Sequence, residues 1–445
     1  MSLFHKGRTL SQELRRFFVC DPTTLPVVHQ DFSPVDLPNL QIAIETYVLA
    51  HHAHLQTLGY TGSIMGVRDS LADLMGSKGA MMGMFDTARI GPVQYQMVDI
   101  DAGEQKPCVE KGVFLIRGDQ GKLAVHLRRD ATFQRGNLVL EVMGLSADLA
   151  AAFLDELRAH ARAFNVYRGK ILSLSCEGQS IQFHQFPSVK REEIILPEAT
   201  MAVLERNTVG FLKHAEALRR SGRSVKRGIL LHGKPGTGKT HTAKWLGQSL
   251  EGTTVILMSG EELWLIKQCC QLARMLAPAL VIMEDVDLVA SQRNEQRHPA
   301  YQITLHQMLN EMDGLASNAE VIFLLTTNRP EAIEGAIAAR PGRIDQAIEF
   351  PLPDADCRRR LLALYGRGLT LALNDEAGLI AHTEGASPAF IQELIRKASL
   401  FAAEQNSTDG DHLRLTDSHF HLALRELLLG GGDLTRSLLG FAPEE

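Results

Sequence analysis

The residues most clearly suited to bind a ligand form the stretch Gly233-Lys234-Pro235-Gly236-Thr237-Gly238-Lys239-Thr240. This stretch lies between an apolar run and a helical run. Its glycines allow the backbone to form a concave nest of N–H groups. With the N-terminus of the following helix, that nest surrounds phosphate oxygens. Lys239 has the position to neutralise β- and γ-phosphate charge, and Thr240 has the position to bind Mg²⁺. Lys234 is interpreted as a solvated lysine of the same nucleotide-binding stretch, which extends to His241.

Three carboxylates, Glu284, Asp285 and Asp287, follow a second apolar run at residues 280–283. Doubly wound sheets bind ligands at the carboxyl ends of their strands. Like charges at this spacing repel one another unless a cation is nearby. We therefore expect Glu284 in the Mg²⁺ shell and Asp285 beside the attacking water, with either carboxylate reaching the metal directly or through water. Asp287 is assigned to a helix cap or to a contact between subunits.

A third polar group ends another apolar run at residues 321–325, where Thr326 and Thr327 precede Asn328. The Asn328 amide can face both the γ-phosphate and the hydrolytic water. The alternative is a turn residue placed before Arg329 and Pro330.

A sheet must bring these three groups together. Short, continuous apolar runs predict strands buried on both faces, at residues 229–231, 255–258, 280–283, 321–325 and 346–350. Their alternation with helical segments predicts an α/β fold, a doubly wound parallel sheet over residues 196–353. Residues 354–430 read as a small α-helical lid, and residues 431–445 as a loosely held tail.

Residues 1–190 predict a separate α+β domain, joined to the rest near Pro187 and Pro197. Apolar spacing favours helices at residues 38–58 and 146–164 and strands beginning near residues 113, 122, 138, 170 and 180. Residues 75–85 are rich in glycine and methionine and are either a buried crossing or a contact surface.

The bulk composition narrows the class of protein. The chain has 445 residues, 45% hydrophobic and 22% charged residues and a formal charge of -6, which gives no electrostatic footprint for nucleic acid. No apolar run has the length of a signal peptide core or a membrane span. Six cysteines show no metal-binding spacing, and the His51, His52 and His54 spacing is poor for a shared metal. We therefore expect a cytoplasmic protein without a transmembrane segment.

Taken in order, the segments GKPGTGKT, VIMEDVD, LNEMDGL, TTNRPE and AARPGRIDQAIEFPLPD resemble the AAA ATPase module, over about half of the chain. The resemblance implies ATP and Mg²⁺ as cofactors. It also implies that Arg340 and Arg343 are arginine fingers, which reach into the site of the neighbouring subunit. The resemblance further places the lid residues Gly385, Ala386 and Ser387 near the adenine, and a relay between subunits at Asn310, Glu311, Asp313 and Gly314.

Two departures from the family pattern affect the functional reading. The order Glu284 then Asp285 is similar to the Bcs1-like branch and related bacterial AAA proteins, and it shortens the catalytic carboxylate by one methylene. The segment around Trp264 is shorter than the aromatic pore loop of protein-threading members. Trp264 is either a remnant of that loop or core packing.

The resemblance implies a hexameric or heptameric ring that hydrolyses ATP at subunit interfaces and acts as a chaperone-like remodeller. In this hypothesis residues 1–190 bind a protein client or regulate the ring. The alternatives are a nucleic-acid-stimulated motor or loader, which the acidic balance disfavours, and a nucleotide-gated scaffold with little hydrolysis.

Overall fold

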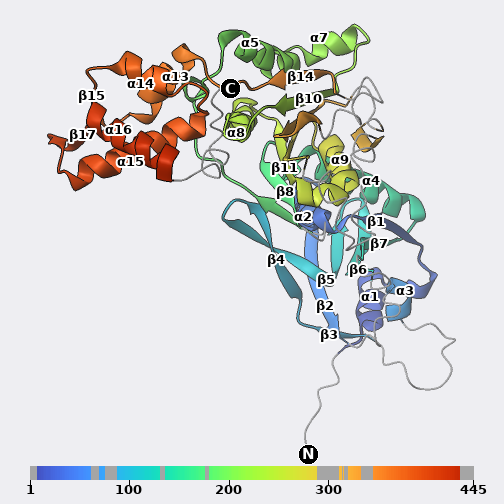
Figure 1. Cartoon of the computed structure of the whole chain (residues 1–445). Helices are drawn as coiled ribbons and strands as arrows, with labels where there is room; N and C mark the ends of the chain where they lie inside the picture. The colour runs from blue at the N-terminus through green and yellow to red at the C-terminus, as the bar shows by residue number, and fades with distance from the viewer. Residues whose placement is uncertain are drawn as a thin grey trace, which may run out of the picture. The chain divides into compact units, whose positions relative to one another are not determined.

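The computed structural model describes residues 8–61, 70–75, 88–130, 136–175, 180–287, 310–312, 314, 319–331 and 344–430 (Figure 1). The chain forms two compact units. The first contains Met1–Arg168 and Leu174–Phe183, and the second contains Gly169–Ser173 and His184–Glu445.

An antiparallel sheet forms the centre of the N-terminal unit, with strand order β1-β7-β6-β5-β2-β3. A further strand, β4, pairs antiparallel with the first half of β5. The strands are β1 (Val27–Phe32), β2 (His54–Thr61), β3 (Arg89–Gly91), β4 (Gln94–Asp101), β5 (Glu104–Gly118), β6 (Gly121–Arg129) and β7 (Leu138–Gly144). A short strand, β9 (Ile181–Phe183), also belongs to this unit.

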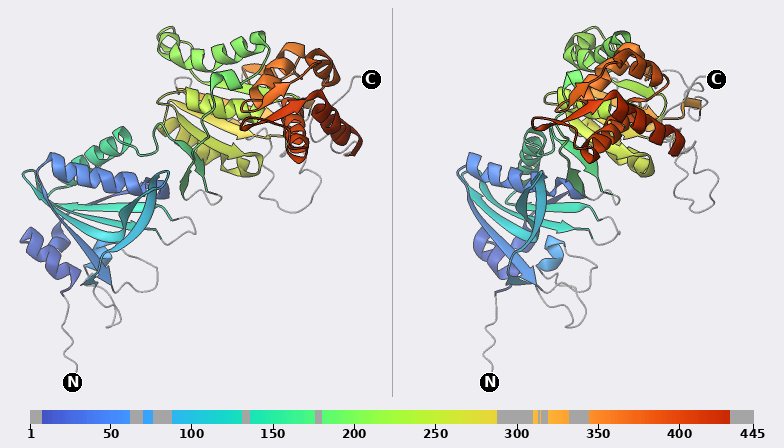
Figure 2. Two further views of the ribbon diagram at one scale, coloured as in Figure 1. Left: turned by 90° about the vertical axis from the view of Figure 1, so that its left-hand side faces the viewer. Right: turned by 60° about the vertical axis from the view of Figure 1, so that its left-hand side comes forward.

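Helices cover both faces of this sheet (Figure 2). Phe114 and Ile116 pack in a core with α2 (Leu37–Ala50) and α4 (Ala147–Ala163). Val113 and Leu115 pack in a second core with α1 (Leu10–Phe18) and α3 (Leu71–Leu74). Because neighbouring residues of a strand face opposite sides, the apolar run at 113–116 serves both cores. Burial of each such side chain contributes roughly 1.5–3 kcal/mol.

Comparison with the sequence shows where local spacing is sufficient. The expected strands near residues 113, 122 and 138 are parts of β5, β6 and β7, and the expected helix at 146–164 is α4. The expected helix at 38–58 is too long, because α2 ends at Ala50 and β2 begins at His54, where it pairs with Arg117. The left-handed backbone of His52, with φ of 48°, separates the two elements, so His51, His52 and His54 do not share a helix.

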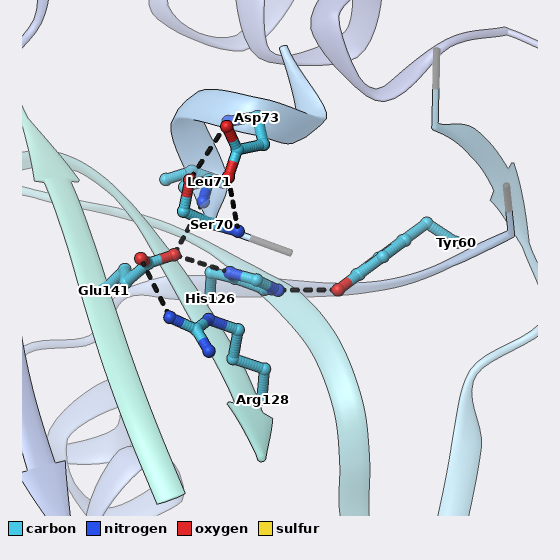
Figure 3. Close-up of polar contacts among 7 residues, drawn as sticks. All are labelled: Tyr60, Ser70, Leu71, Asp73, His126, Arg128 and Glu141. Carbon is cyan, nitrogen blue, oxygen red and sulfur yellow. Dashed lines mark hydrogen bonds and ion pairs between the residues drawn. The ribbon is translucent and has the colours of Figure 1, made fainter. Parts of the chain in front are cut away.

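A buried polar cluster fastens α3 to the sheet of the N-terminal unit (Figure 3). Glu141 Oε2 accepts hydrogen bonds from the Leu71 amide at 2.6 Å and from His126 Nδ1 at 2.9 Å. His126 Nε2 lies 2.7 Å from the Tyr60 hydroxyl, and Arg128 lies 3.6 Å from the second Glu141 oxygen. Since His126 is fully buried, each of its ring nitrogens needs a partner of this kind.

The cluster predicts that acid weakens the N-terminal unit. Burial lowers the pKa of His126 below 6.5, and Arg128 and Lys111 lower it further, although Glu141 opposes them. The unfolded chain therefore binds the His126 proton first, and stability present above pH 6.5 is lost as the pH falls through the folded-state pKa. The pKa of Glu141 is also lowered, by its contacts with His126, so its contribution is lost at lower pH, below 4.5.

In His126→Gln we expect a flatter pH dependence between pH 6.5 and 5. We also expect a loss of about 1–3 kcal/mol at pH 7.5, because a buried hydrogen-bonded group is removed. Both tryptophans, Trp245 and Trp264, lie in the second unit, so circular dichroism rather than their fluorescence should follow this transition. Equal pH slopes in the two proteins would contradict the assignment.

A parallel sheet forms the centre of the second unit, with strand order β14-β10-β13-β12-β11-β8. The expected strands are present as β10 (Arg227–His232), β11 (Thr254–Ser259), β12 (Ala279–Glu284), β13 (Val321–Thr327) and β14 (Gln346–Glu349). The helices that accompany them are α5 (Glu198–Asn207), α6 (Val209–Lys213), α7 (Ala215–Arg220), α8 (Lys239–Ser249) and α9 (Ile266–Met275). The prediction of a doubly wound parallel sheet is confirmed.

One strand lies on the other side of the expected domain boundary. The strand β8 (Ile171–Leu174) pairs parallel with β11, with Ile171 opposite Val255, so residues 169–173 belong to the second unit. The boundary expected at residue 190 therefore lies later in the chain than the first crossing between units, at Arg168. Local pattern cannot tell which sheet a four-residue strand joins, because that choice depends on its pairing partner.

The lid contains more than helices. Its helices are α13 (Ala355–Tyr365), α14 (Glu376–His382), α15 (Pro388–Glu404) and α16 (Asp417–Arg425), followed by the π-helical turn Glu426–Gly430. A small sheet of β15 (Thr370–Ala372), β16 (Thr408–Asp409) and β17 (His412–Thr416) accompanies them. The expected tail at 431–445 lies outside the described residues.

Candidate nucleotide site

Strand register brings the three predicted polar groups to one edge of the sheet. His232 at the end of β10 is paired with Thr327 at the end of β13, and Met283 of β12 is paired with Leu325 of β13. The phosphate-binding stretch begins directly after His232, and Asn328 directly follows Thr327. Parallel pairing therefore gathers residues that are far apart in the sequence.

Two glycines of the stretch have conformations that other residues cannot adopt without strain. Gly233 has φ of 147°, and a Cβ atom there would lie 2.4 Å from the Phe350 carbonyl oxygen. Gly236 has φ of 75°, and its Cβ would lie 2.9 Å from the Ser387 hydroxyl at the start of the lid helix α15. The Gly236 carbonyl accepts a hydrogen bond from the Ala389 amide at 3.2 Å. The stretch therefore contacts the lid directly.

Lys239 is the buried cation of the site and Lys234 is exposed. The Lys239 ammonium donates hydrogen bonds to the carbonyl oxygens of Gly233 at 2.8 Å and Lys234 at 2.9 Å. Burial lowers the pKa of Lys239 from 10.5 to about 8, and the charges of Asp285 and Asp287 oppose that shift. The carbonyl groups that accept hydrogen bonds from this ammonium are neutral, and a polyphosphate would provide negatively charged acceptors instead.

The two residues predicted to bind Mg²⁺ most directly lie beside each other. Burial raises the pKa of Glu284, while Lys244 and a hydrogen bond from the Thr240 side chain lower it. A hydroxyl and a carboxylate are the hard oxygen ligands that Mg²⁺ prefers, and Mg²⁺ retains waters for its remaining positions. These residues fit the expected ion.

Asp285 and Asn328, both expected beside the attacking water, are hydrogen-bonded to each other. The Asn328 amide nitrogen lies 3.2 Å from Asp285 Oδ1. Asp285 has a left-handed backbone with φ of 51°, which is uncommon for a residue other than glycine and turns its carboxylate toward Asn328. Both residues line the same pocket.

The sequence assigned Asp287 to a helix cap or a subunit contact, and the residues after it that a cap would bind lie outside the described residues. The Asp287 side chain is buried. Asp287 Oδ1 accepts hydrogen bonds from the Thr327 hydroxyl at 2.8 Å and from the backbone N–H of Asn328 at 3.3 Å. A buried carboxylate occupied in this way cannot lie at a subunit surface, so it joins the ends of β12 and β13.

A pocket of about 690 Å³ lies between the phosphate-binding stretch, residues 193–196 and the lid. Its walls combine the polar residues above with apolar side chains, which include Ile194, Leu361 and Tyr365. Pro235, Thr237, Gly238, Lys239, Thr240 and the exposed His241 also line it. An apolar wall beside a phosphate site is suited to a nucleotide base.

The lid contributes to this pocket one turn later than expected. Pro388, Ala389 and Gln392 line it, whereas Gly385, Ala386 and Ser387 are not among its lining residues. Ser387 is buried and caps α15, because its hydroxyl accepts a hydrogen bond from the Phe390 amide at 3.2 Å.

Sequence reasoning missed residues 193–196, the segment that leads into the parallel sheet. Ile194 and Leu196 pack in the core of that sheet, whereas Ile195 packs against the core of the lid. Glu193 forms an exposed ion pair with Arg367 of the lid at 3.6 Å. The apolar run between Lys190 and Pro197 was the available signal, and we interpreted it as linker.

Several residues singled out in the sequence are either not described by the structure or lie outside the pocket. Arg340, Arg343 and Asp313 lie outside the described residues, as do residues 76–85 of the methionine-rich segment. Trp264 lies half-buried in the 3₁₀ helix Gly260–Leu265, between the buried Leu263 and Leu265. This placement favours packing.

Several basic residues lie shortly before or at the start of β10, and they do not form the rim of the phosphate site. Lys226 and Arg227 are at the start of β10, and the phosphate-binding stretch follows its other end. Arg219 forms ion pairs with Glu216 and Glu320, and Arg220 forms one with Glu216. This pairing reduces the positive charge that could attract a nucleic acid.

The parallel sheet, the glycine nest and the converging Lys239, Glu284 and Asp285 define a P-loop nucleotide-binding protein. Residues 229–352 match the model of the ATPase family associated with various cellular activities (AAA). This segment of the chain is an AAA ATPase module, as the resemblance predicted. The likeness to the Bcs1-like branch stays a prediction.

Curated relatives agree with this assignment. The chain is 32% identical over 234 residues to the proteasome-activating nucleotidase of Methanothermobacter thermautotrophicus. The aligned region covers 50% of this chain and 57% of the relative. It is 32% identical over 253 residues to the mitochondrial inner membrane i-AAA protease supercomplex subunit YME1 of Saccharomyces cerevisiae, covering 55% and 33%. It is 33% identical over 218 residues to the ATP-dependent zinc metalloprotease FtsH 3 of Synechocystis sp., covering 45% and 34%.

In the part of the chain that the structure describes, no helix is both long and apolar enough to cross a membrane.

Proposed function

We propose that the chain hydrolyses ATP with Mg²⁺ and couples this turnover to the remodelling of a protein client. The observation that carries the proposal is that Lys239, Thr240 and the Asp285–Asn328 pair line one pocket, with Glu284 hydrogen-bonded to Thr240. These groups match the requirements of phosphoryl transfer, which depends on positioning and on stabilising charge.

Each residue then has a definite task. The N–H groups of the nest and Lys239 hold the β- and γ-phosphates, and Thr240 and Glu284 hold Mg²⁺, which neutralises charge that develops on the phosphoryl group. Asp285 accepts a proton from the attacking water or orients it, and Asn328 directs its amide to the γ-phosphate. Asn328 must leave Asp285 or share its amide when the γ-phosphate arrives.

The protein client is supported by what the relatives are called. One relative activates the proteasome and two are proteases or protease subunits by name, so nucleotide turnover and protein handling are associated in them. In the proposal, the N-terminal unit selects the client. The segment at Gly260–Leu265 is a packed 3₁₀ helix, which favours a folded or partly folded client over threading past an aromatic loop. The proposed location is the cytoplasm.

We also propose a hexameric or heptameric ring in which Arg340 and Arg343 complete the site of the next subunit. A guanidinium stabilises charge on the transferring phosphoryl group, and its placement on a neighbour couples turnover to ring geometry.

The ring predicts a dominant defect. Arg343→Ala should bind ATP with nearly normal affinity, yet its turnover should fall by about 10³-fold or more. Mixed with wild-type protein, it should lower ATPase activity by more than its share of the subunits, because one defective subunit disables its neighbour's site. Activity would be measured at fixed total protein over a series of mixing ratios. A straight line in the wild-type fraction would contradict a site shared between subunits.

One other reading has a specific observation in its favour. The shorter carboxylate Asp285, held by Asn328, suits a scaffold that binds ATP and hydrolyses it slowly. The turnover of Asp285→Asn, which is discussed below, separates this reading from the proposed one.

A further inference from the structure

The carboxyl ends of β12 and β13 are fastened by side chains, beyond the point where their backbone ladder ends at Met283 and Leu325. The Asp285 amide donates to the Thr326 hydroxyl oxygen at 3.1 Å, and the Val286 amide donates to the Thr326 carbonyl at 3.1 Å. The Thr327 hydroxyl donates to Asp287 Oδ1 at 2.8 Å. We call Thr326, Thr327 and Asp287 the clasp.

The clasp is buried. Thr326 and Thr327 are 0% exposed and Asp287 is 7% exposed. Burial of a hydroxyl or a carboxylate costs free energy unless the group is hydrogen-bonded, so these side chains depend on their hydrogen bonds. Among the described residues, the hydrogen bonds of these three lead to backbone groups of residues 285, 286, 328 and 329 or to one another. These are the segments that carry Asp285 and Asn328.

Each side of the clasp fixes one residue of the site. Thr326 binds the amides of Asp285 and Val286, and this holds the uncommon left-handed backbone of Asp285. The Asp287 carboxylate accepts a hydrogen bond from the backbone N–H of Asn328 at 3.3 Å. The Thr327 hydroxyl oxygen accepts one from the backbone N–H of Arg329 at 3.0 Å. The Asp285 carboxylate and the Asn328 side chain thereby meet at 3.2 Å.

We propose that Thr326, Thr327 and Asp287 are positioning residues for hydrolysis, which set the distance and angle between Asp285 and Asn328 without contacting ATP. The inference rests on the proposed ATPase function. A misplacement of about 1 Å in a catalytic group can cost about 100-fold in rate. The clasp should therefore affect the chemical step and leave nucleotide binding intact.

Thr327→Val tests the proposal, because valine keeps the shape and removes the donor to Asp287. We expect kcat to fall by about 10- to 100-fold while the ATP Kd and KM stay within about twofold of wild type. Thr327→Ser restores the hydroxyl and should recover most of kcat. Full-length proteins would be compared in steady-state ATPase assays and in binding assays with fluorescent ATP. Thermal melting would establish the folded fraction.

Asp287→Asn provides a second test that does not depend on Thr327→Val folding. Asparagine keeps an oxygen that accepts from Thr327 and from the Asn328 amide, so its loss of kcat should be smaller than that of Asp287→Leu. Equal losses in the two Asp287 variants would overturn the clasp and indicate a role for the charge itself. Wild-type kcat in Thr327→Val, or failure of Thr327→Ser to recover kcat, would also overturn it. Absence of turnover in the wild-type protein would instead defeat the proposed function.

Discussion

Lys239→Ala is expected to lose ATP binding by about 100-fold or more, whereas Lys234→Ala should bind within a fewfold of wild type. The two lysines belong to the same stretch, but Lys239 is buried over the phosphate nest and Lys234 is exposed. A hydrogen bond to a charged partner contributes about 1.5–3 kcal/mol, and Lys239 can donate several to polyphosphate. Removal of the Lys234 charge changes little, because solvent screens it.

Titration calorimetry with a non-hydrolysable ATP analogue would measure both affinities, with Lys234→Ala as the matched control. The wild-type affinity should also fall as the pH rises above 8. The pKa of Lys239 is about 8 in the free protein, and phosphate charge must raise it in the complex, so binding favours the protonated form. Equal affinities of the two variants, or no weakening between pH 8 and 9.5, would contradict the assignment.

Asp285→Asn is expected to bind ATP normally and to lose about 10²- to 10⁴-fold in kcat, the range for loss of a general base. Asparagine keeps the size of Asp285 and its contact with Asn328, but it cannot accept the proton of the attacking water. Steady-state phosphate release would measure kcat, and the binding assay above would verify the site.

Glu284→Gln is the informative comparison, because it changes the neighbouring carboxylate. We expect it to raise the Mg²⁺ concentration needed for half-maximal turnover, since Glu284 is hydrogen-bonded to Thr240, whereas Asp285 is hydrogen-bonded to Asn328. Equal and low turnover in wild type and Asp285→Asn would support the scaffold reading. Asp285→Asn held with ATP also provides a trap in which a client should co-purify.

The structure determines where the chain should be cut to delete the N-terminal unit and test its part in client binding. Deletion of residues 1–190 would also delete β8, which pairs with β11 in the parallel sheet. It would bring the cut within four residues of Glu193 and Ile194 at the nucleotide pocket. A deletion that ends near Arg168 keeps β8 and leaves residues 174–183 of the N-terminal unit in place.

Much of the N-terminal unit could not be predicted from local pattern. The strands β1 to β4 were missed and α2 was extended through residue 58, because β2 alternates weakly and is defined by its pairing with β5. The attachment of α3 is similarly non-local. It depends on a hydrogen bond from Leu71 to Glu141, 70 residues later in the chain.

The sequence alone determined the phosphate-binding stretch, the strands around it and the two neighbouring carboxylates. These features are local: consecutive N–H groups form the nest, and a continuous apolar run is buried wherever its strand lies. Tertiary structure decided the role of Asp287, the membership of β8 and the wall at residues 193–196. Thr327 and Asp287 are 40 residues apart, and only the parallel order of β12 and β13 brings their side chains within 2.8 Å. Contacts of this kind follow from strand order and register, which no local spacing encodes.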